Sequence, residues 1–393
     1  MPWKEKTVEK LRCEFVQEVL QGEESKGALC RKYSITRATG DKWLKRYLSG
    51  EGLGNRSRAP FHTPNRTPAQ VEEKVLMVRT AHPTWGARKI HEVLRRANET
   101  VIPAQSTITD ILRRNGRISK EASEAATPYK RFERESCNEL WQTDFKGYFK
   151  MADGTICHPL TVLDDHSRYS LCIDAKENET REGVTASFLR LFEEYGLPNA
   201  LLCNNGNPWG TSQSTGYTQF EIWLMDYGIL PIHGRIRHPQ TQGKEERFHR
   251  TLKTDLLKHT TIADLNDAQR QFDAFRYCYN HERPHEAIGM AVPAERYHPL
   301  RRKVPAYLPQ WEYPAGYELR RVKGTGFVTY RGQGYFLSES FGEKYVAVRE
   351  SLIKDCVNVY YRGFRIARIN IEERSFVSKK IYLTKDNDVP PEF

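Results

Sequence analysis

Two carboxylates, Asp144 and Glu246, have sequence surroundings that suit a bound cation. Asp144 lies between aromatic residues in a run that predicts a buried strand, and a buried carboxylate is costly unless a cation pairs with it. Glu246 starts a helical pattern in which Arg250 and Lys253 follow at i+4 and i+7 on the same face. A carboxylate with cations behind it suits a metal ion in front of a phosphate backbone, although a solvated helix with ion pairs is the plain alternative.

The hydrophobic pattern predicts how these carboxylates are positioned. Phe248, Leu252 and Leu256 recur at four-residue steps and predict the buried face of the helix just described. Three extended runs are followed by alternating helical and extended runs, which predicts a mixed sheet covered by helices. Asp164 and Asp165 fall at the turn between the second and third strands, and we interpret them as turn-forming residues. We expect strands at 140–150, 157–163, 169–175, 200–203 and 229–233, and helices at 180–195 and 218–227.

Two modules of three short helices each are predicted before the sheet, at residues 1–50 and 67–118, with a linker at 51–66. Apolar residues define an inward face and basic residues an outward face, which is the outline of a helix-turn-helix DNA-binding domain. Small three-helix bundles with other functions have the same outline, but two modules in tandem favour a bipartite DNA site. The linker arginines contact a phosphate backbone or keep the segment soluble. The basic residues expected to face DNA are Arg37, Lys42, Lys45, Arg46, Arg56, Arg58, Arg88, Lys89 and Arg113.

The charge distribution favours a polyanionic partner. The chain has 61 Lys+Arg and 50 Asp+Glu, a formal net charge of +11. Residues 1–137 hold 27 Lys+Arg and 17 Asp+Glu, so +10 of this excess lies in the first third. The eight cysteines are scattered, which argues against a zinc finger or a disulfide framework. Without a visible signal peptide or a membrane-spanning run, we expect a soluble cytosolic protein.

The rest of the sequence divides into a polar linker, a core and a β-rich end. We expect the linker at 119–137, the core with the mixed sheet at 138–300 and the β-rich end at 301–393. Short β runs separated by Gly-containing turns, from 327–330 to 364–369, are typical of a small barrel or sandwich, and we expect a barrel. The predicted fold class is therefore multidomain: two all-α helix-turn-helix modules, an α/β core with a mixed sheet, and a small all-β barrel.

Four motifs follow one another in the core: Trp-Gln-Thr-Asp144, then Cys-Asn204-Asn-Gly, then His-Pro-Gln-Thr-Gln-Gly-Lys-Glu-Glu246-Arg-Phe-His-Arg-Thr-Leu-Lys, and finally Tyr279-Asn-His-Glu-Arg-Pro-His285. Together they resemble the motifs of bacterial insertion-sequence transposases, which have a retroviral-integrase-like catalytic core of the RNase H type. The resemblance covers nearly the whole chain. It implies an RNase H-like fold for the core.

In that family three acidic residues hold two divalent cations, normally Mg²⁺, with Mn²⁺ able to substitute. The resemblance places these ligands at Asp144, Asn204 and Glu246. The implied chemistry is DNA strand cleavage and strand transfer, in which two metals about 3.5–4 Å apart activate the attacking oxygen and stabilise the leaving one. Asn204 departs from the family, which has Asp there. Because an amide is uncharged and bridges two cations poorly, we expect a catalytically impaired chain, whether the substitution is engineered or natural.

The resemblance also implies the partners. The two modules would bind the terminal inverted repeats of an element, the core would also hold target DNA, and a homodimer or larger assembly would process two ends together. Lys244, Arg247, Arg250 and Lys253 are expected to contact the DNA backbone, with ordinary surface positions as the alternative for Lys244 and Lys253. No membrane partner is expected, and the implied location is the bacterial cytoplasm, at the nucleoid.

The sequence leaves two alternatives to transposition. A non-catalytic DNA-binding regulator derived from a transposase is the alternative, with Asn204 as its native residue. A nuclease of RNase H type acting on RNA–DNA hybrids is disfavoured, because it would not need two sequence-reading modules.

Overall fold

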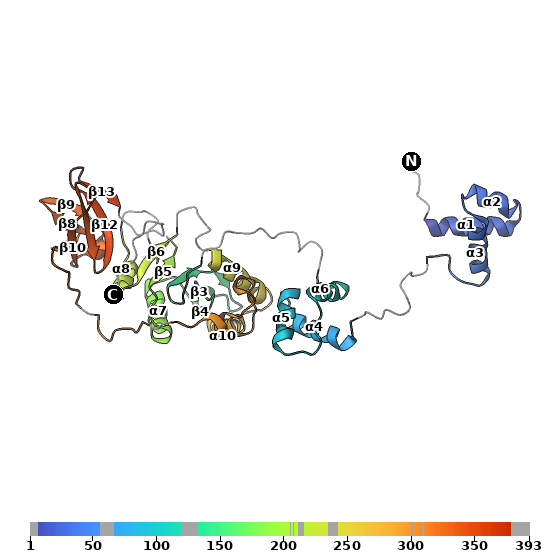
Figure 1. Cartoon of the computed structure of the whole chain (residues 1–393), viewed down its shortest axis with the longest axis horizontal. Helices are drawn as coiled ribbons and strands as arrows, with labels where there is room; N and C mark the ends of the chain where they lie inside the picture. The colour runs from blue at the N-terminus through green and yellow to red at the C-terminus, as the bar shows by residue number, and fades with distance from the viewer. Residues whose placement is uncertain are drawn as a thin grey trace. The chain divides into compact units, whose positions relative to one another are not determined.

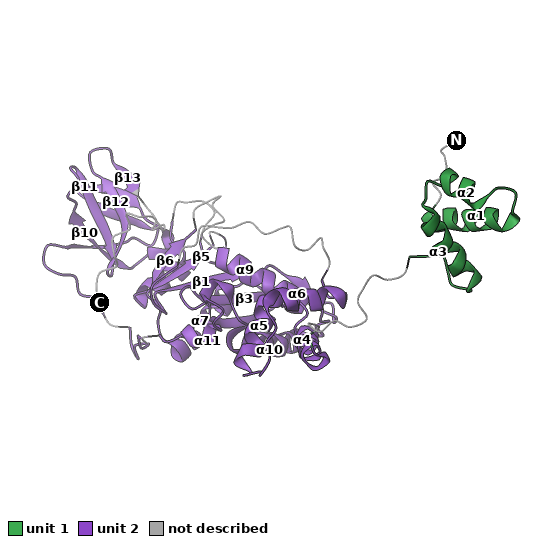
Figure 2. Cartoon of the chain, turned by 45° about the vertical axis from the view of Figure 1, so that its right-hand side comes forward, with its two compact units in different colours: residues 1–67 green, residues 68–393 purple. Residues whose placement is uncertain are grey.

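The computed structural model describes residues 7–55, 67–118, 133–204, 206, 208–210, 216–234, 243–299, 302–308 and 310–378. Residues 1–67 form one compact unit and residues 68–393 form another (Figure 2). Within the described ranges, no helix combines the length and the apolar composition that crossing a lipid bilayer requires. The predicted loop residues 235–242, which precede the helix with Glu246, lie outside the described part of the chain.

The first unit is a three-helix module made of α1 (Val8–Gln21), α2 (Lys26–Lys32) and α3 (Arg37–Leu48). A hydroxyl side chain caps the N-terminus of each helix by accepting a backbone N–H, as sequence reasoning expects at a helix start. Gly40 allows α3 to approach closely, because a Cβ there would lie 2.9 Å from both Cys30 and Phe15. The module extends into the predicted linker, since Leu53 is buried in its core.

The second module contains α4 (Ala69–Ala81), α5 (Ala87–Arg96) and α6 (Gln105–Arg114). Its apolar core includes Trp85, Ile90 and Ile108, all at most 2% exposed. The module packs against the core domain: Arg96 forms a two-bond ion pair with Glu295 at 2.6 and 3.0 Å. A bidentate guanidinium–carboxylate pair fixes orientation as well as distance.

The core sheet has the mixed topology that the sequence predicts. Antiparallel β4–β3–β1 pairing continues into parallel β1–β5–β6 pairing, and the short β2 extends the far end of β3. The strands are β1 (Leu140–Phe145), β2 (Phe149–Lys150), β3 (Ile156–Asp164), β4 (Ser170–Lys176), β5 (Ala200–Cys203) and β6 (Leu230–His233).

Helices cover both faces of this sheet (Figure 1). On one face α7 (Arg181–Tyr195) and α8 (Gln219–Asp226) share a buried cluster with Trp141, Leu160 and Val162. On the other face α9 (Gly243–Leu252), the π-helical turn η3 (Lys253–Leu257) and α10 (Leu265–His281) pack over Leu163 and Ile173. A short helix, α11 (Pro293–Arg296), follows. Sequence reasoning assigned no element to residues 265–281, where α10 lies.

The C-terminal region is all-β, as predicted, but the expected closed barrel is wrong. Its described strands form an open sheet in the order β13–β12–β11–β10–β7 and a separate hairpin of β8 and β9. The two edge strands, β7 and β13, do not pair with each other in the described residues. Closure requires such pairing, and these two four-residue edge strands had no clear alternating pattern in the sequence. The strands are β7 (Glu318–Arg321), β8 (Phe327–Tyr330), β9 (Gln333–Phe336), β10 (Tyr345–Glu350), β11 (Cys356–Tyr361), β12 (Phe364–Asn370) and β13 (Ser375–Ser378).

The C-terminal sheet shares a hydrophobic core with α8. Tyr217, Ile222 and Met225 are buried in the same cluster as Val346, Val357 and the other inward residues of the sheet. Polar contacts join the same surfaces: the Tyr361 hydroxyl donates to Asp226 at 2.7 Å. The apolar face of α8 is therefore covered by the C-terminal region.

Candidate active site

The carboxyl ends of two parallel strands bring Asp144 and Asn204 together. β1 and β5 pair in parallel with Gln142 opposite Leu202, so Asp144 and Asn204 follow at equivalent positions two residues later. The Asn204 amide donates to Asp144 Oδ1 at 2.6 Å, and the Phe145 N–H donates to the same oxygen at 2.9 Å. Two residues that are 60 positions apart in the sequence thus touch at one sheet edge, the edge where open α/β sheets bind their ligands.

The charge environment of Asp144 favours a bound cation. Burial raises the pKa of Asp144 to about 6, against the lowering effect of the hydrogen bonds from Asn204 and Phe145. Glu179 and Glu246 raise this pKa further because they are nearby negative charges. A divalent cation would relieve both the burial and the repulsion.

Helix α9 carries two adjacent glutamates that face different surroundings. Glu246 is exposed, and its only described effect on the site is electrostatic, through the raised pKa of Asp144. Glu245 is 1% exposed, and burial together with Asp144 raises its pKa well above the usual range. Adjacent residues on a helix point about 100° apart, so both can border one site only from different sides. We call Asp144, Glu245 and Glu246 the carboxylate cluster.

One threonine links Glu245 to the strand of Asp144. Thr161 lies directly opposite Asp144 in the β1–β3 pair. Its hydroxyl is 3.0 Å from the Asp144 carbonyl, 3.1 Å from Glu245 Oε2 and 2.7 Å from His249 Nε2. Burial lowers the pKa of His249 to about 3, so the imidazole is neutral. The Thr161 hydroxyl has one proton to donate and three groups within hydrogen-bond distance of it.

A buried ion pair between His233 and Glu221, which the sequence pattern did not predict, holds the backbone of Asn204. His233 ends β6, opposite Cys203 on β5, and contacts the Asn204 carbonyl at 3.0 Å and Glu221 at 2.8 Å. Burial alone would lower the pKa of His233, but Cys203 and Glu221 outweigh burial and raise it to about 10. A protonated imidazole donates both N–H groups, which fixes the backbone of Asn204. The available signal was a histidine at the end of the strand predicted at 229–233.

The turn residues Asp164 and Asp165 are fully buried and satisfied by protein groups. Asp164 accepts from the backbone N–H of Asn138 and Ser167 and from the Ser167 hydroxyl at 2.6–2.8 Å. Asp165 forms an ion pair with Lys244. Both carboxylates hold the fold, in agreement with their interpretation as structural residues. This pairing also means that Lys244, predicted as a DNA contact, lies half-buried rather than extended into solvent.

The other predicted cations of α9 and η3 face outward. Arg247, Arg250 and Lys253 are exposed, while Phe248, Leu252 and Leu256 are buried, which confirms the predicted apolar stripe. The exposed face therefore carries Glu246 followed by three cations. The π-helical turn begins at Lys253, and such turns occur frequently at functional sites.

The predicted DNA-facing residues of the first module separate into two groups. Arg37, Lys42 and Lys45 are exposed. Arg46 differs from its expected outward position: its guanidinium donates to the carbonyls of Gly52 and Gly54 at 2.6 and 3.2 Å. Sequence alone did not reveal that the residues after α3 fold back to be held by this arginine. Arg56 and Arg58 lie outside the described residues.

In the second module the predicted cations also differ from one another. Arg113 is exposed and pairs with Asp110 at 2.6 Å. Arg88 pairs with Glu286 of the core domain at 3.2 Å. Lys89 was expected to point outward but is half-buried, and burial with the nearby Arg283 lowers its pKa to about 8. The docking of this module on the core domain covers a side chain that an isolated module would expose.

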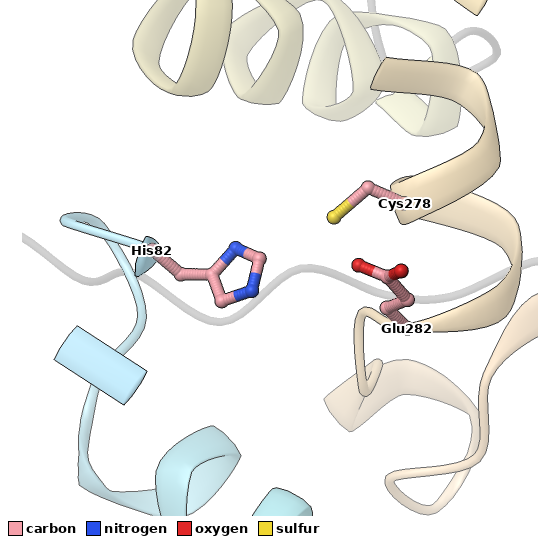
Figure 3. A group of neighbouring side chains, drawn as sticks. All are labelled: His82, Cys278 and Glu282. Atoms are coloured by element: carbon pink, nitrogen blue, oxygen red, sulfur yellow. The ribbon is translucent and has the colours of Figure 1, made fainter. Parts of the chain in front are cut away.

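A mixed group of polar side chains lies at the same docking surface. His82 follows α4, Cys278 lies in the last turn of α10 and Glu282 directly follows that helix, and the three side chains face one another (Figure 3). Their potential ligand atoms are within 4.8 Å of one another. However, the His82 ring stacks on Trp85 at 3.6 Å, and burial raises the pKa of the Cys278 thiol to about 12, where it hydrogen-bonds Glu282. We interpret the group as part of the docking contact.

The carboxylates of the cluster are of the chemical kind that holds a divalent metal ion. They supply hard oxygen ligands, which Mg²⁺ and Mn²⁺ prefer. In addition, Glu245 Oε1 is buried without a hydrogen-bond partner among the described residues. An orphaned buried carboxylate oxygen is costly, and a cation would compensate it.

Sequence comparison identifies known domains in the same order. Residues 134–239 match an integrase core domain, and residues 227–293 match a second description of the integrase core domain. Residues 11–61 match a helix-turn-helix domain and residues 39–112 match a homeodomain-like domain. Both three-helix modules are therefore helix-turn-helix domains, and the mixed sheet is an integrase-type core.

Curated relatives come from bacterial insertion elements. The chain is 26% identical over 255 residues to the insertion element IS476 uncharacterized 39.2 kDa protein of Xanthomonas euvesicatoria, covering 62% of this chain and 70% of the relative. It is 26% identical over 230 residues to transposase InsD for insertion element IS2A/D/F/H/I/K of Escherichia coli, covering 54% and 73%. Among solved structures, a simian T-cell lymphotropic virus intasome in complex with a PP2A regulatory subunit aligns with 74% of this chain and 96% of its own at 16% identity, with a TM-score of 0.37.

Proposed function

Because the chain belongs to the insertion-sequence transposases with an integrase-like core, we propose that it binds the ends of a mobile element and catalyses metal-dependent DNA cleavage and strand transfer. The observation that carries the proposal is the contact between Asp144 and Asn204 at the carboxyl edge of the sheet, with Glu246 close enough to raise the pKa of Asp144. Two motifs that are far apart in the sequence touch there, and the third acts on Asp144 through its charge.

Each residue has a defined task in this proposal. Asp144 and Glu246 supply charged oxygens for divalent cations, normally Mg²⁺, and the Asn204 position supplies a neutral one. Bound metal would activate the attacking oxygen and stabilise the leaving oxygen of a phosphodiester. The His233–Glu221 pair holds the backbone of Asn204 in place. Arg247, Arg250 and Lys253 would bind the DNA backbone beside the cluster.

Asn204 is proposed to impair the chemistry. Its amide donates a hydrogen bond to Asp144 at 2.6 Å, which is an interaction that a carboxylate at position 204 would not make. An uncharged side chain also bridges two cations poorly, so a second metal would be held weakly. The protein would bind its DNA and assemble normally but turn over slowly.

The two helix-turn-helix domains are proposed to bind the terminal inverted repeats as double-stranded DNA. The exposed Arg37, Lys42 and Lys45 of the first domain are the strongest candidates for backbone contacts. A homodimer or larger assembly would bring two ends together, along with target DNA. This part of the proposal rests on the family, and the cellular setting would be the nucleoid.

Reversion of the substitution tests the proposal. Asn204→Asp should raise Mg²⁺-dependent nicking and strand transfer by on the order of 10²- to 10³-fold, because a bridging carboxylate stabilises the transition state by several kcal/mol. The assay would use DNA carrying the element's own ends, with Asn204→Asp/Asp144→Asn as the inactive control. If Asn204→Asp cleaves no DNA with Mg²⁺ or Mn²⁺ while still binding the ends, the alternative function, a non-catalytic DNA-binding regulator, is favoured.

A further inference from the structure

We infer that Glu245 is a third carboxylate ligand of the cation site and replaces the negative charge that Asn204 lacks. This inference rests on the proposed function, because it concerns the same metal ion. Under this inference, metal affinity and catalysis depend on different residues. Glu245 would preserve the affinity for one cation, while Asn204 would still fail to bridge a second.

The position of Glu245 beside Asp144 is the first argument. Thr161 is the cross-strand partner of Asp144, and residues paired in this way project on the same face of a sheet, about 4.5–5.5 Å apart. The Thr161 hydroxyl lies 3.1 Å from Glu245 Oε2. Glu245 therefore packs on the face of the sheet that carries the Asp144 side chain, next to the residue paired with Asp144. The family motif instead gives the ligand role to Glu246.

The unsatisfied state of the Glu245 carboxylate is the second argument. The side chain is 1% exposed, and Oε1 has no hydrogen-bond partner among the described residues. Oε2 lies within hydrogen-bond distance of the Thr161 hydroxyl, which also contacts the Asp144 carbonyl and His249. His249 Nε2, one turn further along the same helix, lies 3.6 Å from Glu245 Oε2, which is beyond hydrogen-bond distance. A buried carboxylate with so few protein partners is the group that a divalent cation would satisfy.

The chemistry at position 204 is the third argument. The Asp144–Asn204 contact joins a carboxylate to a neutral amide, so one negative charge is absent from the expected set of three. Glu245 supplies one additional charge, which restores three carboxylates around the site. Three hard anionic oxygens match the preference of Mg²⁺ and Mn²⁺.

Manganese binding to the full-length protein tests the inference without relying on catalysis. Mn²⁺ alone is titrated into the protein, and free Mn²⁺ is followed by its electron paramagnetic resonance signal. Glu245→Gln, which has the shape of a protonated glutamate, should weaken Mn²⁺ binding about 10- to 100-fold. Glu245→Asp should restore part of the affinity, and Glu92→Gln, a buried glutamate in the second module, should leave it unchanged. Unchanged Mn²⁺ affinity in Glu245→Gln overturns the inference.

Two further comparisons separate this inference from the proposed function. If Asp144→Asn weakens Mn²⁺ binding but Glu245→Gln does not, the proposed site stands and the role of Glu245 is wrong. If neither variant weakens it, the proposed cation site fails as well. Without metal, Glu245→Gln should unfold at the same denaturant concentration as the parent or at a higher one. A lower midpoint combined with unchanged Mn²⁺ affinity indicates a purely structural glutamate and also overturns the inference.

Discussion

The two ends of strand β1 place buried carboxylates in opposite situations. At its beginning, Trp141 pairs with Asp164, which accepts two backbone N–H groups and a hydroxyl, and the adjacent Asp165 has an ammonium partner. Near its end, Asp144 has two donors on one oxygen, and Glu245 has a share of one hydroxyl. The carboxylates at the beginning of β1 thus have several hydrogen-bond donors or a cation, and those near its end have fewer.

This difference distinguishes structural carboxylates from functional ones. A buried carboxylate that the protein satisfies contributes to a unique fold, whereas one left unsatisfied lowers stability until a ligand arrives. Glu245 is as buried as Asp164 and Asp165, at no more than 1% exposed, while Asp144 is half-buried. The number and kind of donors differ, and this number can be changed one residue at a time.

The largest expected effect on stability comes from substituting Asp165, which lies at the end of β1 where the carboxylates have full sets of partners. Asp165→Asn removes the charge that pairs with the half-buried Lys244, so the free energy of unfolding should fall by about 3–5 kcal/mol. Asp144→Asn, measured in the absence of metal, is the matched variant and should leave the free energy of unfolding unchanged or raise it. Urea denaturation of both variants measures the difference. Equal destabilisation by the two substitutions would contradict the difference proposed between the two ends of β1.

A smaller loss of stability is expected when the His233–Glu221 pair is changed. Both side chains of this pair have partners, and the pair lies next to the candidate site. Glu221→Gln leaves His233 with a neutral acceptor and should cost about 1.5–3 kcal/mol at pH 7. The folded pKa of His233 is raised to about 10, above its unfolded value, so its stabilisation is fully present below about pH 6.5 and is lost as the pH rises toward 10.

Unfolding measured from pH 6 to pH 10 checks this sign. The parent should lose stability across the window, and Glu221→Gln should lose less because its histidine has a smaller shift. His249 provides the internal contrast, since its pKa is lowered and it is neutral throughout the window. A parent whose stability rises between pH 7 and pH 9.5 would show that His233 is not protonated in the folded state.

The smallest effect concerns two lysines of the same motif. Lys253 is exposed, so Lys253→Gln should leave stability unchanged and reduce the salt dependence of DNA binding by about one unit in the slope of log K against log salt. Lys244→Gln should instead lower stability, because it leaves Asp165 buried without its cation. A titration of DNA binding at several salt concentrations, with urea unfolding of both variants, separates the two roles.

Local pattern predicted most of the elements but few of the partners. The apolar stripe of α9 and the strands of the core followed from side-chain periodicity, which depends on neighbours within a few residues. The partner of Lys244 is 79 positions away, and the carbonyls held by Arg46 belong to a segment read as linker. Long charged side chains can adopt several conformations, and the fold determines which partner each of them contacts.

The candidate site shows the same limit at two adjacent residues. The motif identified Glu246, but periodicity could not show that Glu245 would be the buried member of the pair, since a buried glutamate is unusual at any helix position. The closed barrel was wrong for a related reason: whether two short edge strands meet depends on the curvature of the whole sheet. Helix α10 was missed although its last three residues, 279–281, begin the last family motif.

The hydrophobic core that α8 shares with the C-terminal sheet limits how this chain can be shortened or recombined. Cutting the protein after its catalytic part would leave Ile222 and Met225 facing water. The same helix carries Glu221, which orients His233 and, through it, the backbone at position 204. Truncation should therefore disturb the candidate site as well, and an exchange of C-terminal regions between relatives would have to include this helix.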